Sequence, residues 1–146
     1  MYDTILVPLD NSPTDETILR HIRPLARLCG SRLVLIHVAD GHAARNQSQL
    51  NLADSQEIRD DHSYLAARRD ELAGEGFGVS FHLPRGDPAT EILRIAGEEH
   101  ADLIAMGTHG HGLIKDAILG TVANEVRHRT CTPVLLVRAP QDKAAR

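Results

Sequence analysis

Residues 4–10 read Thr-Ile-Leu-Val-Pro-Leu-Asp, a short β-branched and aliphatic run that ends in a proline, a leucine and an aspartate. An uninterrupted apolar run of this length is typical of a strand buried on both faces of a parallel sheet. The next residues, Ser12-Pro13-Thr14-Asp15, combine an N-cap, a proline suited to the first helical turn and an acid three residues after the cap. Apolar residues at helical spacing follow as far as Gly30, so the chain is expected to begin with a strand and a helix.

The same alternation of strand and helix continues along the chain. Asp87 with Pro88 is expected to open one helix, and Gly120 with Thr121 the last one, while the polar stretch 39–51 is expected to be a loop. The sequence predicts further strands over 32–38, 79–84, 103–106 and 134–137, and further helices over 55–73, from 88 onward and over 120–129. This order predicts an α/β fold, an open, doubly wound, five-stranded parallel sheet with helices on both faces, in a single domain over residues 1–146.

Composition narrows the classes of partner. The 146 residues include 20 acidic and 16 basic ones, for a formal net charge of −4, and no Lys/Arg cluster offers a stripe that would neutralise a phosphate backbone. The chain has two tyrosines, two phenylalanines and no tryptophan, which is too few for a base-stacking platform. We therefore expect no nucleic-acid partner.

Cysteine usage and hydropathy point to the cytoplasm. Cys29 and Cys131 lie far apart in sequence and form no CxxC pair, which argues against a disulfide framework and against a thiolate metal site. The N-terminus has no cationic leader, and no stretch approaches the roughly 20 apolar residues of a membrane-spanning helix. The expected protein is cytoplasmic and has no membrane partner.

Two segments have the composition of a ligand site. In open α/β sheets, ligands lie beyond the carboxyl ends of the strands, where the strand order reverses. Pro8-Leu9-Asp10 follows the first strand, and the glycine-rich residues 107–112 follow the fourth. Gly107 and Gly110 are three apart, and nine residues separate Gly110 from the pair Gly120-Thr121. Small residues and the N-terminus of a helix together make a plausible phosphate cradle.

Simpler interpretations of these residues stay open at this point. Glycines after a strand often serve only the turn, and Asp10 is nearly as well explained as a turn residue that bonds to Ser12 or to neighbouring N–H groups. Nothing matches the P-loop spacing, and the first strand–helix turn has no glycine for a dinucleotide fingerprint. The site is therefore neither that of a P-loop ATPase nor an NAD site of the usual kind.

The spacing Gly107-x-x-Gly110-x9-Gly120-Thr121 resembles that of the universal stress protein family, in its ATP-binding branch. The strand that ends in Met106, the segment Val7-Pro8-Leu9-Asp10 and the closing segment Pro133-Val-Leu-Leu-Val-Arg138 are also similar to the family pattern. The resemblance implies a Rossmann-like sheet of order 3-2-1-4-5, related to the adenine nucleotide alpha hydrolases. In that order both candidate segments meet at one crevice.

The resemblance also implies which residues bind the ligand, which is ATP or another adenine nucleotide. Asp10 would contact ribose hydroxyls or a divalent cation such as Mg²⁺, and Thr121 keeps the hydroxyl of the serine that is common at its position. The implied adenosine contacts are Pro8, Leu9, Asp10 and Val38, and the implied triphosphate contacts are Gly107, Gly110, Gly120, Thr121 and Val122. Met106 at the end of the fourth strand and His109 complete the set of predicted binding residues.

The histidines do not predict a metal site. His109-Gly-His111 supplies two ligands on a loop, whereas a metal site needs three or four that converge. These two histidines are better placed to line the phosphate region, where partial protonation would favour an anion. His37 is expected to be a hydrogen-bonded core residue, and Lys115 a solvated surface residue.

Three functions are compatible with these residues. The favoured one is a nucleotide-binding regulatory module of the stress response. A slow ATPase or nucleotide-processing enzyme is the second, but the glycine loop has no evident Lys/Arg pair with a dedicated acid, and we assign no catalytic residue. The third is an interaction protein that binds no nucleotide. Family resemblance also implies a homodimer that forms through the edge strand Val134 to Val137.

Overall fold

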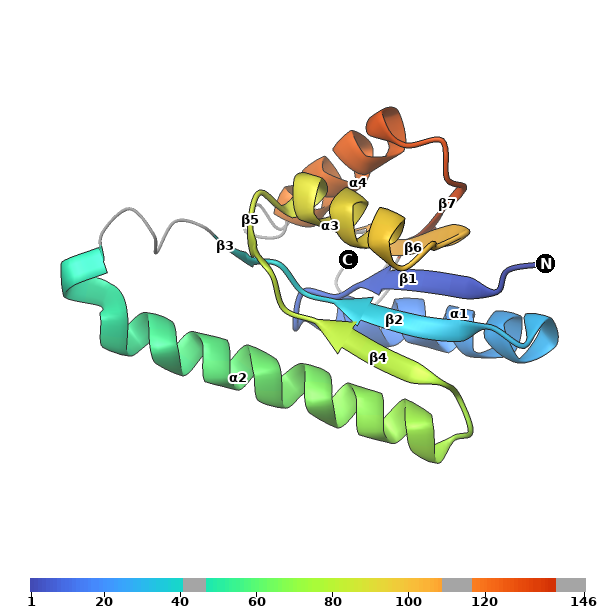
Figure 1. The fold of residues 1–146 in the computed structure, drawn as a ribbon, viewed down its shortest axis with the longest axis horizontal. Helices are drawn as coiled ribbons and strands as arrows, with labels where there is room; N and C mark the ends of the chain where they lie inside the picture. Colours follow the sequence, from blue (N-terminus) through green and yellow to red (C-terminus); the bar gives the residue numbers. More distant parts are fainter. Residues whose placement is uncertain (41–46, 109–116, 139–146) are drawn as a thin grey trace, which may run out of the picture.

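The computed structural model of the protein describes residues 1–40, 47–108 and 117–138. Its main sheet has five parallel strands in the order β4-β2-β1-β6-β7 (Figure 1). The strands are β1 (Thr4–Pro8), β2 (Arg32–Ile36), β4 (Val79–His82), β6 (Leu103–Thr108) and β7 (Val134–Arg138). Numbered along the chain, these five strands have the expected order 3-2-1-4-5, and the predicted fold class is confirmed.

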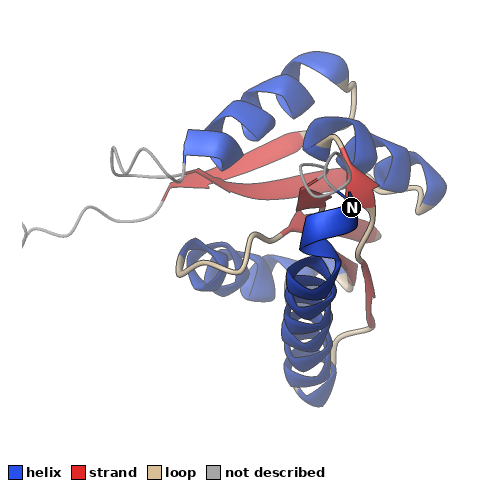
Figure 2. Cartoon of the chain, turned by 90° about the vertical axis from the view of Figure 1, so that its left-hand side faces the viewer, coloured by secondary structure: helices blue, strands red, loops and turns tan. Residues whose placement is uncertain are grey.

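Helices cover both faces of this sheet (Figures 1 and 2). α1 (Thr14–Cys29) and α2 (Gln47–Gly74) pack on one face. α3 (Pro88–Glu98) and α4 (Ala117–Arg129) pack on the other. None of the helices in the described part of the chain combines the length and the apolar character that crossing a membrane requires.

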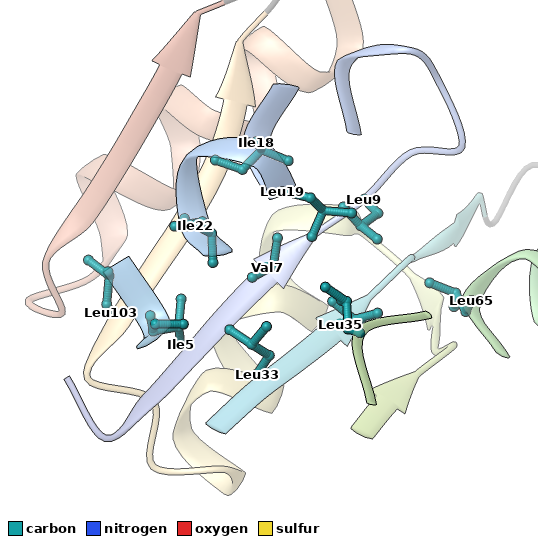
Figure 3. Close-up of a cluster of buried hydrophobic side chains, with 13 residues drawn as sticks. Ile5, Val7, Leu9, Ile18, Leu19, Ile22, Leu33, Leu35, Leu65 and Leu103 are labelled. Carbon is teal, nitrogen blue, oxygen red and sulfur yellow. The ribbon is translucent and has the colours of Figure 1, made fainter. Parts of the chain in front are cut away.

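β1 lies at the centre of the core because both of its faces are covered. Ile5 and Val7 belong to the apolar cluster beneath α1 and α2, whereas Leu6 belongs to the cluster beneath α3 and α4. Figure 3 shows Ile5 and Val7 among aliphatic side chains from α1 and β2. Burying one such side chain contributes roughly 1.5–3 kcal/mol. The alternation along a single strand therefore joins the two helical layers into one molecule.

A second, two-stranded sheet was not predicted. β3 (Ala39–Asp40) pairs in parallel with β5 (Arg85–Gly86), just beyond the carboxyl ends of β2 and β4. The Ala39 N–H donates to the Pro84 carbonyl (2.8 Å) and leads the chain into this pair. Strands of two residues carry no periodicity, so the sequence had no pattern from which to predict them.

Helix α2 is longer than the sequence indicated. A helix was predicted over 55–73 and a loop over 39–51, but α2 begins at Gln47, and Ala39–Asp40 is a strand. The predicted loop is thus wrong at both of its ends, and residues 41–46 between them lie outside the described part. No glycine or proline interrupts the chain from Gln47 to Ala73, so nothing in the backbone stops the helix from starting early. In Figure 1, α2 extends past the carboxyl ends of the strands.

The ends of the strands also differ from the predicted ones. β2 ends at Ile36 rather than residue 38, and β4 ends at His82 rather than residue 84. β6 was predicted to end at Met106 but continues to Thr108, because Gly107 and Thr108 pair with residues 137 and 138 of β7. Gly107 is therefore a strand residue and not part of a glycine-rich loop.

Close packing explains why position 107 is glycine. A Cβ atom at Gly107 would lie 2.7 Å from Cγ2 of Thr14, at the start of α1. Thr14 is β-branched and has little freedom to move aside. We expect Gly107→Ala to lower the free energy of unfolding by about 1–3 kcal/mol through overpacking, as measured by urea denaturation.

Two further variants test this cause. Adding Thr14→Ser to Gly107→Ala removes the clashing methyl group and should restore most of the lost stability. A Cβ atom added at Gly97 in α3 would meet no other atom within 4 Å, so Gly97→Ala should leave stability unchanged or raise it by up to about 1 kcal/mol. A Gly107→Ala protein as stable as the wild type would contradict the packing argument.

Candidate functional site

The candidate site lies where three neighbouring strands end. Pro8, the last residue of β1, pairs with Ile36, the last residue of β2. On its other side β1 pairs with β6 through Leu6 and Ile104, and two residues further along these strands come Pro8 and Met106. The connections from β1 and β6 run in opposite directions from this point of the sheet, which is where open α/β sheets bind ligands. The structure therefore brings together the ends of β1, β2 and β6, on or just beyond which Pro8, Val38 and Met106 lie.

Leu9 and Asp10 follow β1 directly but differ in environment. Leu9 is buried in the cluster beneath α1 and α2, its N–H donates to the Ile36 carbonyl (2.8 Å), and its own carbonyl bonds to His37 Nδ1 (2.8 Å). Asp10 is half-buried, and its Oδ1 accepts a hydrogen bond from the Ser12 hydroxyl (2.5 Å). Asp10 therefore has the turn role that the sequence left open, and its contact with a ligand stays a prediction.

His37 has the predicted role of a hydrogen-bonded, largely buried residue. Its Nδ1 donates to the Leu9 carbonyl, and its Nε2 lies 3.3 Å from Oδ2 of Asp61 on α2. Since a carbonyl oxygen only accepts hydrogen bonds, the proton on Nδ1 is fixed by this contact. The ring thereby links the end of β1 to α2.

Three of the predicted site residues share an apolar environment on the other face of the sheet. Met106 and Val122 belong to the cluster beneath α3 and α4, and Val38 packs against it. Met106 is completely buried and Val122 nearly so. The structure places these residues in one cluster, and their contact with a ligand stays a prediction.

The predicted phosphate residues are only partly described. His109 and Gly110 lie outside the described residues. Gly120 and Thr121 were expected to open the last helix, but α4 begins at Ala117, so this boundary was wrong. Residues 117–119 are Ala-Ile-Leu, which are compatible with a helix and extend it toward its N-terminus. Gly120 is therefore the fourth residue of α4, just after the residues whose backbone N–H groups have no partner within a helix, and exposed Thr121 follows it.

Asp15 is the residue near this site whose role sequence reasoning missed. It was interpreted only as part of the helix cap, but its side chain is 1% exposed and reaches back over the β1–α1 loop. Oδ1 accepts a hydrogen bond from the Asp10 N–H (3.0 Å), and Oδ2 accepts one from the Asn11 N–H (2.8 Å). Tyr64 of α2 donates its hydroxyl to the same Oδ2 (2.5 Å). An acid three residues after Ser12 was a visible signal, but its partner on α2 was not.

Burial sets the charge state of this cluster. Loss of solvent raises the pKa of the Asp15 carboxyl to about 6; the hydrogen bonds from Tyr64 and from the Asp10 N–H oppose that shift, and the Asp10 carboxylate adds to it. Burial and the bond to Asp15 raise the pKa of the Tyr64 hydroxyl above its ordinary value. Tyr64 is therefore a hydrogen-bond donor throughout the neutral range.

Ion pairs hold α2 against α1 beside this cluster. Arg68 of α2 contacts Glu16 of α1 (2.8 Å), and Arg23 of α1 contacts Glu71 (3.0 Å) and Glu75 (2.9 Å). Both arginine side chains are mostly buried, so water screens these contacts less than it screens fully exposed pairs. The two helices are thereby fixed relative to each other where Tyr64 meets Asp15.

The described residues contain no group of side chains that could form a metal centre. In residues 1–40, 47–108 and 117–138, no three His, Cys, Asp or Glu side chains come together as a metal site would require. The predicted His109 and His111 lie outside these ranges.

The raised pKa of Asp15 predicts how stability depends on pH. The folded-state value of about 6 exceeds the ordinary value of 3.8, so the folded chain binds more protons between these two values. The stability contributed by this group is complete below the lower value and is lost as the pH rises through 6. We expect the difference in unfolding free energy between wild type and Asp15→Asn to grow in favour of the wild type as the pH falls from about 7.5 to 5, with a slope of at most about 1.4 kcal/mol per pH unit.

Urea denaturation of both proteins at matched pH values measures this difference. The other titratable groups are present in both proteins, so their contributions to the pH dependence largely cancel. Parallel stability curves for the two proteins would contradict the raised pKa.

Comparison with known proteins agrees with the fold. The universal stress protein family matches residues 1–138. Universal stress protein MJ0577 of Methanocaldococcus jannaschii is 31% identical over 94% of this chain and 96% of its own length. The solved structure of MJ0577 matches 97% of this chain and 99% of its own with a TM-score of 0.86.

Two other solved structures share the fold at lower identity. One is a universal stress protein in complex with cAMP, at 22% identity and a TM-score of 0.68, which matches 94% of this chain and 97% of its own. The other is the universal stress protein of Archaeoglobus fulgidus in complex with dAMP, at 23% identity and a TM-score of 0.65, which matches 93% of this chain and 98% of its own. Since the family match spans residues 1–138 and a relative 31% identical is covered almost end to end, the chain belongs to the universal stress protein family.

Proposed function

We propose that this chain is a regulatory module that binds an adenine nucleotide, ATP in particular, at the carboxyl ends of β1, β2 and β6. The observation that carries the proposal is that β2, β1 and β6 are neighbours and end where the strand order reverses, with Asp10 and Val38 two residues beyond β1 and β2 and Met106 near the end of β6. Family members solved with cAMP and with dAMP support an adenine nucleotide as the ligand class. A role in the stress response and a cytoplasmic location are parts of the same proposal.

The nucleoside half of the ligand would lie against aliphatic groups. Val38, Met106 and Val122 offer an apolar wall, and segments 8–10, 36–38 and 106–122 contain no Phe, Tyr or Trp. Adenine would therefore be recognised by aliphatic contact and by backbone hydrogen bonds rather than by stacking. The Asp10 carboxylate suits the ribose hydroxyls, because an ionised carboxylate accepts hydrogen bonds and a ribose hydroxyl donates them.

The phosphates would lie toward the start of α4. This helix follows β6 and begins on the side of the sheet where β6 ends (Figure 1). The free N–H groups at the N-terminus of a helix suit an anion, and Gly120 lies in the first turn of α4. His109, Gly110 and the Thr121 hydroxyl would complete the phosphate contacts, and Mg²⁺ near Asp10 would balance the charge of ATP.

A substitution in the first turn of α4 tests the phosphate site. Gly120→Val adds a branched side chain where the phosphates are proposed to approach the backbone, so it should weaken ATP binding at least about tenfold, or 1.4 kcal/mol, and adenosine binding less than about twofold. Calorimetric titration with each ligand measures both affinities.

A matched variant on the same helix serves as the control. Asn124 is exposed one turn further along α4, and Asn124→Val should leave both affinities unchanged. Equal weakening of ATP and adenosine by Gly120→Val would contradict the phosphate role.

A wild-type protein that gives no heat and no rise in Tm with ATP and Mg²⁺ would contradict nucleotide binding itself and favour an interaction protein. Sustained phosphate release that Gly110→Val abolishes would favour an enzyme.

The nucleotide-bound module is proposed to act as a homodimer through β7. β7 is an edge strand of the main sheet, and Leu136 on it is 41% exposed. An exposed apolar edge strand invites pairing with another strand, and antiparallel pairing of β7 with its copy would cover Leu136.

A charge at this edge should separate the subunits. We expect the wild type to have the mass of a dimer in light scattering at micromolar concentration and Leu136→Lys the mass of a monomer, because a lysine at the pairing edge opposes strand addition. Leu28 on α1 is 85% exposed, so Leu28→Lys is a control that should stay dimeric. A monomeric wild type, or a dimer that survives Leu136→Lys, would count against β7 as the interface.

A further inference from the structure

The β1–α1 loop, which carries Asp10, is held by a carboxylate from inside the protein. Asn11 in this loop has a φ of 59°, a left-handed conformation that a non-glycine residue adopts at some cost. The Asp15 carboxylate accepts the N–H of Asp10 and the N–H of Asn11, one on each oxygen. Two hydrogen bonds to a buried charged group compensate for the unusual backbone and fix its shape.

Helix α2 completes this arrangement. The Tyr64 hydroxyl donates to Oδ2 of Asp15 (2.5 Å) and accepts a hydrogen bond from Nε of Arg68 (3.3 Å). The Arg68 guanidinium also lies over the Tyr64 ring, 5.5 Å from its centre, and pairs with Glu16 (2.8 Å). A continuous chain of hydrogen bonds therefore runs from α2 to the backbone of Asp10.

Asp10 is the residue at the end of this chain. Its backbone N–H is bonded to Asp15, and its Oδ1 accepts the Ser12 hydroxyl. Both the backbone and the side chain of Asp10 are thus restrained before any ligand binds. A group that is already oriented loses less conformational freedom on binding, which favours affinity.

We infer that Asp15 and Tyr64 are positioning residues that orient the Asp10 carboxylate toward the ribose hydroxyls of the bound nucleotide. This inference rests on the proposed function and specifies how its nucleoside half is held. It also assigns a role to α2, since Tyr64 reaches the loop only while α2 is packed against α1. Asp15 suits this role better than Asn would, because its two oxygens accept three donors and an amide nitrogen would turn a donor toward one of them.

The test compares two ligands that differ only in the ribose. Adenosine has both ribose hydroxyls, and 2′,3′-dideoxyadenosine has neither. Tyr64→Phe removes one hydroxyl from the chain of hydrogen bonds and keeps the ring. We expect it to weaken adenosine binding about three- to tenfold and to change dideoxyadenosine binding less than about twofold. Asp15→Asn should act in the same direction.

Tyr2→Phe is the matched control. Tyr2 is partly buried beside the same core cluster but lies before β1, at the opposite end of the strand from Asp10. The same chemical change there should leave both affinities unaltered. A further variant tests the route through Asp10: once Asp10→Asn is present, adding Tyr64→Phe should cause no further loss of adenosine affinity, because the two residues act as one unit.

Several results would overturn the inference. The inference is wrong if Tyr64→Phe leaves adenosine binding at the wild-type level. It is also wrong if Tyr64→Phe weakens both ligands equally, since equal weakening with a lowered Tm marks general loosening of the fold. If the wild type binds adenosine and dideoxyadenosine equally well, Asp10 does not contact the ribose hydroxyls and the inference is wrong, whereas the proposed binding of ATP would still stand. A wild type that binds neither nucleoside nor ATP overturns the proposed function itself, and the inference with it.

Discussion

Burial of β1 on both faces is the constraint on which the rest of the structure depends. A strand with apolar side chains on alternate sides must be covered twice, so Ile5 and Val7 require α1 and Leu6 requires α3 and α4. The same strand must also have hydrogen-bonding partners on both edges, which β2 and β6 provide. A central parallel strand that is covered on both faces and hydrogen-bonded on both edges ends between the ends of its two neighbours. The polar residues that follow these strands therefore lie together at one edge of the sheet.

Contacts within the protein explain two residues near the carboxyl ends of the strands whose roles were first interpreted differently. Gly107 was interpreted from its spacing as a point where backbone approaches phosphate, yet the structure gives it a sufficient reason in the methyl group of Thr14. Asp15 was interpreted as a cap, yet it is a buried carboxylate with three donors. Both residues link α1 to the strand ends, so the start of α1 is the element that fixes the geometry around Asp10.

Sequence patterns predicted what depends on local periodicity and missed what depends on contacts distant in sequence. The five strands and their order followed from apolar runs such as 4–9, together with the family resemblance. The pair β3 and β5 is too short for a pattern, and the early start of α2 at Gln47 lies in a polar stretch without one. Tyr64 and Asp15 are 49 residues apart, so only the packing of α2 against α1 reveals them as one group.

The scarcity of aromatic residues makes the hydrogen bonds from Tyr64 and Asp15 to the β1–α1 loop more important for the proposed site. Without a stacking partner, an adenine base bound near Val38, Met106 and Val122, as proposed, would gain mainly from contact that is weakly directional. Orientation of the ligand then falls to hydrogen bonds at the ribose and the phosphates, and these discriminate strongly only where the protein groups are held in place. Tyr64 contributes indirectly, because its hydroxyl bonds to Asp15, which holds the β1–α1 loop. The helix that carries Tyr64, α2, extends beyond the strand ends (Figure 1). If Asp10 holds the ribose as proposed, anything that shifts α2 would act on the ribose end of the site before it acts on the base.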